Sequence, residues 1–252
     1  MPYRYLFPIL SLIVNVSSLR AENKLFFSKT ETKYVIHSGQ CPKIHVGKLA
    51  LSIIKSYDEG KSLLAIKEQM LAEGLVEKYF LKDFHILLNP ISKEFQFQFE
   101  CPRPLLKAQI YDRKLKKSYL GVLGDHGEMM DPSFEVTLRQ EKMLDNKLPF
   151  MAINWDDLVA KKQIKIVKLL DLFSAKLKSN LSEVILNSED ELTLILKSKS
   201  KGVSVFMGDD AWDLKLDKLT KVLNHFEKLD RMPTLVNLAS VKKVVVKFDA
   251  NL

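Results

Sequence analysis

Residues 84–99, Phe-His-Ile-Leu-Leu-Asn-Pro-Ile-Ser-Lys-Glu-Phe-Gln-Phe-Gln-Phe, decide the fold predicted for the first half of the chain. Phe84, Ile86 and Leu88 alternate with other residues, and after Asn89-Pro90 three phenylalanines alternate with glutamines. Strict alternation is typical of strands that bury one face. Because Asn-Pro has turn chemistry, we expect two strands joined by a turn.

The residues before this hairpin have a helical period. Apolar positions recur at helical spacing over residues 46–57 and again over 63–71, with Gly60 between the two runs and Gly74 after the second. Glycine at such places interrupts or ends a helix. A short β-prone segment at residues 33–38 comes first. The order predicted for residues 33–110 is therefore strand, helix, helix, strand, strand.

Residues 111–252 predict a mainly antiparallel β-domain covered by two helices, so that the whole chain is α+β. One long helix is expected after Asn154, with Asp157 as a capping-box variant. Another is expected after Gly208, with Asp209 and Asp210 as N-capping groups favoured by the helix dipole. The strands are expected around residues 118–123, 184–187, 192–196, 203–207, 235–238 and 244–248.

The first 21 residues predict a signal sequence or a membrane anchor. Arg4 is followed by an apolar run without charge until Arg20, which is typical of a secretory signal. The run is shorter than the roughly 20 apolar residues of a full span, so a cleaved signal and an uncleaved anchor both remain open. Residues 22–32 are polar and predict a linker. In either case we expect the folded part outside the cytoplasm, as an exported soluble form if the signal is cleaved.

Cys41 and Cys101 are the two cysteines of the chain. They fit an oxidising compartment if they pair, and the alternative is two buried free thiols. Cys41 and His45 have a spacing found in metal sites, but zinc sites normally supply three or four ligands in recognisable groups. We therefore expect no metal here.

The composition argues against nucleic acid and against catalysis. The net charge is +8, but most basic residues are lysines, whereas nucleic-acid recognition relies on the arginine fork and on aromatic side chains clustered with it. The chain has no Gly-x-Ser-x-Gly elbow, no Gly-rich phosphate loop and no His-Glu-x-x-His pair. We therefore expect no catalytic residue, no cofactor and no enzymatic activity.

The order of elements in residues 33–110 is that of a POTRA domain, and the chain resembles the bacterial cell-division family FtsQ/DivIB. Residues 100–108 resemble the family's E-R-x-P-x-A passage, residues 120–132 its strand–turn–strand, and residues 148–150 its L-P before a long helix. Residues 203–216 are similar to its signature of a strand, a glycine and a later Lys-Leu pair. Residues 235–248 fall where the family has v-D-L-R-Y and a final strand, with Asn237, Ala239 and Ser240 in place of Asp, Arg and Tyr.

The resemblance implies a non-enzymatic scaffold anchored in the cytoplasmic membrane, with its domains in the periplasm. Such proteins bind the small coiled-coil division proteins FtsB and FtsL, and the complex regulates septal peptidoglycan synthesis. If the last strand lies at a sheet edge, its unpaired backbone groups are available to a partner strand, and a Val245→Pro change should abolish binding. The alternative is that this strand lies inside the sheet. The partner-binding residues predicted are Ser240, Lys243, Val244, Val245, Val246 and Phe248.

Two other functions remain open. One is a POTRA-containing periplasmic adaptor of secretion or outer-membrane assembly, which should act together with a transmembrane β-barrel. The other is an exported enzyme whose active site is assembled from residues distant in sequence.

Overall fold

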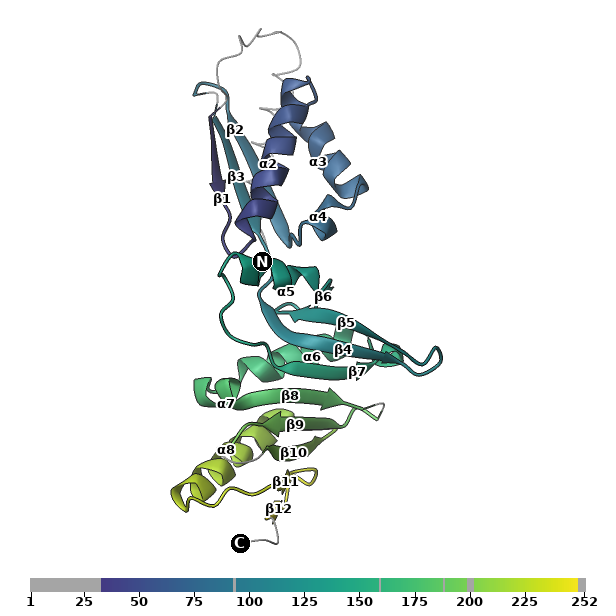
Figure 1. Ribbon diagram of the computed structural model, residues 1–252, viewed down its shortest axis with the longest axis vertical. Coiled ribbons are helices and arrows are strands. Elements are labelled where there is room, and N and C mark those ends of the chain that lie inside the picture. The colour runs from purple at the N-terminus through teal and green to yellow at the C-terminus, as the bar shows by residue number, and fades with distance from the viewer. Residues whose placement is uncertain (1–32, 93, 159, 188, 199–201, 249–252) are drawn as a thin grey trace, which may run out of the picture.

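The computed structural model describes residues 33–92, 94–158, 160–187, 189–198 and 202–248 (Figure 1). The predicted signal or anchor and the predicted linker lie outside these residues. Within the described ranges, no helix has both the length and the apolar character needed to cross a bilayer.

The N-terminal module is a three-stranded sheet covered by helices. The sheet order is β1-β3-β2, with β1 parallel and β2 antiparallel to β3. The alternating phenylalanines of β3 are buried beneath the helices, whereas the intervening glutamines are exposed. The predicted order is confirmed, with one additional short helix, α4. The elements are β1 (Lys33–His37), α2 (Lys43–Asp58), α3 (Leu63–Ala72), α4 (Leu75–Lys78), β2 (Asp83–Asn89) and β3 (Glu94–Glu100).

The C-terminal module is built on a nine-stranded sheet of order β12-β11-β10-β9-β8-β7-β4-β5-β6. Its strands are β4 (Pro104–Asp112), β5 (Lys117–Gly124), β6 (Met129–Met130), β7 (Phe150–Asn154), β8 (Leu181–Leu186), β9 (Leu192–Leu196), β10 (Val203–Gly208), β11 (Leu235–Asn237) and β12 (Val245–Lys247). Its helices are α5 (Ser133–Gln140), the 3-10 helix η2 (Trp155–Asp157), α6 (Ala160–Asp171), α7 (Ala175–Asn180) and α8 (Trp212–Lys228).

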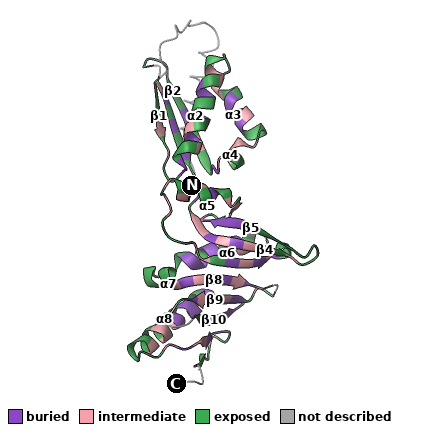
Figure 2. Ribbon diagram, viewed as in Figure 1, coloured by how far each residue is buried: buried purple, intermediate pink, exposed green. Residues whose placement is uncertain are grey.

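The connections explain why helices cover one face of the large sheet. Strands β7 and β8 are parallel and are joined through α6 and α7, and β10 and β11 are parallel and joined through α8. A parallel connection needs such a crossover. Alternate residues of the central strands face these helices and form one continuous core, visible as the buried segments in Figure 2. On the other face, Phe150 and Phe206 are exposed. The α+β class is confirmed.

The boundary between the modules differs from the expected one at residue 110. That position lies inside β4, which pairs with β5 and β7 of the large sheet, so the change of sheet falls between Glu100 and Pro104. Helix α5 does not follow the sheet boundary, because its Phe134 packs on Phe80 in the N-terminal core, with ring centroids 4.8 Å apart. The two modules therefore share side chains.

The prediction of a single long helix after Asn154 is wrong. Residues 155–157 form a 3-10 turn, and two helices, α6 and α7, follow. Ser174 has an extended backbone, and its Oγ accepts a hydrogen bond from the N–H of Leu177 at 3.2 Å, so it caps a new helix. The apolar spacing continues through this break because Phe173 and Leu177 are buried in the same core.

Candidate partner-binding edge

Strand β12 lies at one end of the nine-stranded sheet, and within the described part of the chain it pairs with β11 alone. The register is antiparallel, with Val246 opposite Val236. Val246 packs partly against the core, whereas Val244 and Val245 are 38% and 58% exposed. One face of the strand therefore packs against the core and the other face is exposed. The backbone edge that points away from β11 is open.

Contacts at the end of β12 attach it to the body. The carbonyl oxygen of Lys247 accepts hydrogen bonds from the backbone N–H of Thr234 at 2.9 Å and from its hydroxyl at 3.2 Å. The ring of Phe248 lies edge-on to Phe226 of α8 at 5.2 Å, and the guanidinium of Arg231 sits 4.5 Å from the Phe248 centroid. Phe248 thus serves to hold the strand.

The turn from β10 into α8 is built differently from the expectation. Neither Asp209 nor Asp210 caps α8, because the N-cap is Ala211, which has a left-handed backbone and no capping side chain. Instead, the fully buried ammonium of Lys215 donates to the carbonyl of Met207 at 2.8 Å and to Oδ1 of Asp210 at 2.5 Å. The hydrogen bond from Lys215 holds the pKa of Asp210 below its ordinary value.

This turn supports the loop that leads into β12. Gly208 has a positive φ of 69°, and a Cβ there would lie 3.3 Å from both the Cα of Ala239 and Nζ of Lys215. The N–H of Leu238 also donates to the carbonyl of Phe206 at 2.8 Å. A side chain at Gly208 would be strained by the positive φ and would crowd Ala239, so the glycine of the 203–216 stretch favours the close approach of the β11–β12 loop to β10. The lysine of the same stretch fixes the turn through Met207 and Asp210.

The predicted residues fall into two groups. Ser240, Lys243, Val244 and Val245 are exposed along the loop and the strand, and Ser240 accepts a weak hydrogen bond from the N–H of Lys242 at 3.3 Å. Val246 and Phe248 face the body instead. The residues that sequence reasoning missed are those that position the edge: Phe226, Arg231, Thr234 and the buried Lys215. For Lys215 alone there was a signal, its spacing from Gly208 in the family-like stretch.

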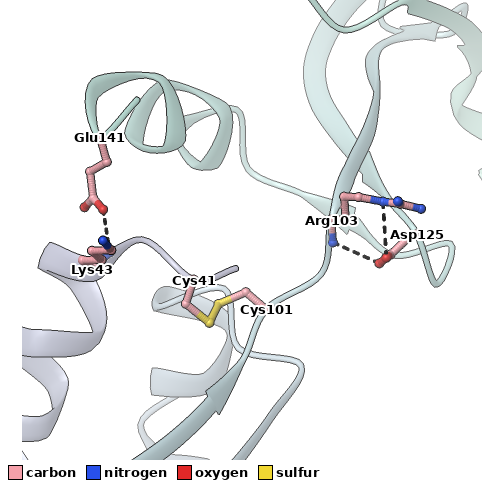
Figure 3. The surroundings of a disulfide bond; sticks show 6 residues. All are labelled: Cys41, Lys43, Cys101, Arg103, Asp125 and Glu141. Carbon is pink, nitrogen blue, oxygen red and sulfur yellow. Dashed lines mark hydrogen bonds and ion pairs between the residues drawn. A yellow bond between two sulfur atoms is a disulfide. The ribbon is translucent and has the colours of Figure 1, made fainter. Parts of the chain in front are cut away.

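A second group of contacts lies where the two modules meet (Figure 3). Cys41 and Cys101 form a disulfide between the turn before α2 and the segment after β3, with Cα atoms 5.0 Å apart. Both residues are buried. Next to the disulfide, the backbone N–H of Arg103 donates a hydrogen bond to Oδ1 of Asp125 in the large-sheet module, at 3.0 Å. Because Cys41 is bonded to Cys101, it does not form a metal site with His45.

Glu141 caps a helix of the other module. Its two carboxylate oxygens accept the N–H groups of Lys43 and Ile44 at 2.6 and 2.9 Å, at the start of α2. The local N-cap residue of α2 is Pro42, which has no side-chain acceptor. A carboxylate from the segment after α5 therefore satisfies the first amides of α2 and complements the helix dipole.

The described residues contain no group of three or more His, Cys, Asp or Glu side chains arranged to hold a metal. The fold defines a class of two-module α+β protein whose large sheet ends in the open strand β12. A family model described as "Cell division protein FtsQ/DivIB, C-terminal" matches residues 115–242, slightly more than half of the chain. The chain belongs to the FtsQ/DivIB family, whose members are non-enzymatic cell-division proteins, and its role is in cell division. A search among curated proteins found no match.

Proposed function

We propose that the protein is a divisome scaffold that acts outside the cytoplasm and recruits and regulates septal peptidoglycan synthesis. Its N-terminal module serves as a POTRA domain, and residues 1–21 attach the chain to the cytoplasmic membrane or direct its export. Its partners are FtsB/FtsL-type coiled-coil division proteins. The observation that carries the proposal is the position of β12 at the end of the sheet in a chain of the FtsQ/DivIB family.

The proposed mode of binding is strand addition on the outer edge of β12. An edge strand presents a row of unpaired N–H and C=O groups, which a partner segment extends as a further strand. Lys243 and Lys247 flank the exposed valines of this edge. Lysines on an edge oppose indiscriminate pairing and favour an acidic partner segment.

The backbone geometry identifies the residue to test. The carbonyl of Lys247 points to β11, because it accepts from Thr234. Backbone groups alternate sides along a strand, so Val245 also directs its N–H toward β11 and Val246 directs its N–H outward. Val246→Pro therefore removes a donor from the open edge, where proline is tolerated. Val245→Pro instead breaks a bond within the sheet.

The test is a crosslinked pull-down of the tagged full-length protein from its native membranes, with mass spectrometry of what it captures. We expect the unaltered protein and Val246→Thr, which retains the N–H, to recover small single-span coiled-coil proteins and septal synthases. Val246→Pro should recover at most a tenth as much while remaining folded, although the loss of the partly buried valine side chain lowers its melting temperature. Equal recovery by a folded Val246→Pro variant would refute strand addition. Recovery of outer-membrane or secretion components instead would favour the POTRA adaptor alternative.

A further inference from the structure

The hairpin that joins β4 to β5 has a basic apex with an exposed apolar residue. In Figure 1 this loop projects to the right, beyond the rest of the large sheet. Leu115 lies in the loop with 60% of its surface exposed. Oδ1 of Asp112 accepts the N–H groups of Lys114 and Leu115, each at 2.9 Å, which fixes the turn. The basic residues around Leu115 are Arg113, Lys114, Lys116 and Lys117, all exposed.

Aromatic side chains lie directly behind this apex. The rings of Tyr119 and Trp155 are 5.6 Å apart, and these side chains are 39% and 50% exposed. Tyr111 and Leu120 of the same two strands are 41% and 53% exposed. Tyr119 and Leu120 are consecutive in β5 and face opposite sides of the sheet. Tyr111 lies opposite Ser118, on the side of Leu120. Exposed apolar side chains thus lie on both faces of the hairpin behind its apex. The hairpin therefore combines an apolar apex, a basic loop and an aromatic collar.

The charges of the loop are only partly neutralised. Nζ of Lys114 is 3.3 Å from a carboxylate oxygen of Asp156, and Asp112 lies at the start of the loop. Among the described residues, no ion pair involves Lys116 or Lys117. The apex thus carries an excess of positive charge available to an external anionic surface.

We propose that this hairpin contacts an anionic phospholipid bilayer, with Leu115 among the headgroups or below them and the aromatic collar at the interface. Tyr and Trp favour the headgroup level of a bilayer because one part of each ring system is apolar and the other polar. Lysine and arginine stems extend along apolar surface while their charged ends reach lipid phosphates. An acidic protein partner would also attract the basic residues, but the combination of an apolar apex, flanking basic residues and aromatic side chains behind them favours a bilayer.

The protein carries its own reporter for this contact. Trp155 is half exposed beside the hairpin, whereas Trp212, the other tryptophan, is buried at 6% exposure. The full-length chain is reconstituted in vesicles of brominated phosphatidylcholine, alone or mixed equally with phosphatidylglycerol. The N-terminal segment is present in every sample, so the difference between the two compositions reports on the folded part. Trp155→Phe gives the background from Trp212.

We expect bromine quenching and a blue shift of Trp155 emission in the anionic vesicles, both reduced by high salt. The K114E/K116E/K117E variant should weaken membrane contact by about 100-fold, since each basic residue near an anionic surface contributes about fivefold. Leu115→Ser should retain the salt dependence and lose the quenching. The matched control K178E/K221E/K228E changes the net charge equally on exposed helix positions of α7 and α8 and should behave as the unaltered protein.

Two outcomes would overturn the proposal. One is equal Trp155 quenching in neutral and anionic vesicles, or in the hairpin variant and the unaltered protein. The other is no effect of lipid together with a blue shift on addition of poly-L-glutamate, which would assign the hairpin to an acidic protein partner.

Discussion

Reduction of the Cys41–Cys101 disulfide should strongly destabilise the N-terminal module. The bond joins residues 60 positions apart and so encloses α2, α3, β2 and β3 in one loop. In the chain-entropy treatment, closing a loop of this length restricts the unfolded chain and contributes about 4 kcal/mol to the free energy of unfolding. With a urea dependence of about 2 kcal/mol per molar, the unfolding midpoint should fall by roughly 2 M on reduction.

The measurement is urea unfolding followed by far-UV circular dichroism, with and without a phosphine reductant, and with thiol titration of each sample. The slope of the transition should rise on reduction, because the open chain exposes more surface when unfolded. The control is Cys41→Ala with Cys101→Ala, whose unfolding should not respond to reductant. If two thiols titrate in the reduced protein and its midpoint stays within the error of the oxidised one, the loop-closure reasoning is refuted.

Two further predictions concern charged groups. Glu141→Ala should lower the free energy of unfolding by about 1–2 kcal/mol, because two amides at the start of α2 lose their acceptor. The same denaturation assay measures this change. The exposed control Glu68→Ala should change the free energy of unfolding by less than about 0.5 kcal/mol. The pKa of Asp157 lies below its ordinary value because the hydrogen bonds from Lys162 and Asn154 outweigh the opposing effect of burial. The stability that it contributes is therefore present at neutral pH and is lost as pH falls below 3.8 through the folded value. Asp157→Asn should flatten this acid limb in melting curves between neutral and acid pH, and an unchanged limb would contradict the assignment.

Local periodicity in the sequence was sufficient for the N-terminal module. The alternation at residues 84–99 and the helical spacing before it correspond to β2, β3, α2 and α3. These patterns are reliable because each element buries one regular face against its neighbours.

The elements at the junction were missed because nonlocal contacts decide them. Residues 104–110 of strand β4 fall inside the predicted first domain, and the pairing of this strand with β5 and β7 is not evident from its own residues. Helix α5 is short, and its Phe134 is buried in the core of the other module. Glu141 could not be identified as a cap, since the helix that it caps begins 98 residues earlier.

The sequence predicted the position of the terminal strand β12 better than the hydrogen bonds of the turn that supports it. The final strand was placed by its apolar run and by the resemblance, and it lies at the end of the sheet. The two aspartates before α8 follow the usual pattern of N-caps, but the left-handed Ala211 and the buried Lys215 use that turn differently. The buried ammonium of Lys215 takes Asp210 as its partner, so this aspartate does not cap the helix.

The contacts between the two modules fix the distance from the N-terminal sheet to strand β12. The Glu141 cap and the shared helix α5 connect the two modules at separate points, and the disulfide closes the N-terminal module beside this junction. The N-terminal sheet and β12 lie toward opposite ends of the long axis of the molecule (Figure 1). A protein bound at β12 is therefore separated from whatever holds the N-terminal sheet by a stiff spacer, whose length is fixed by folding and not by the reach of a flexible tether.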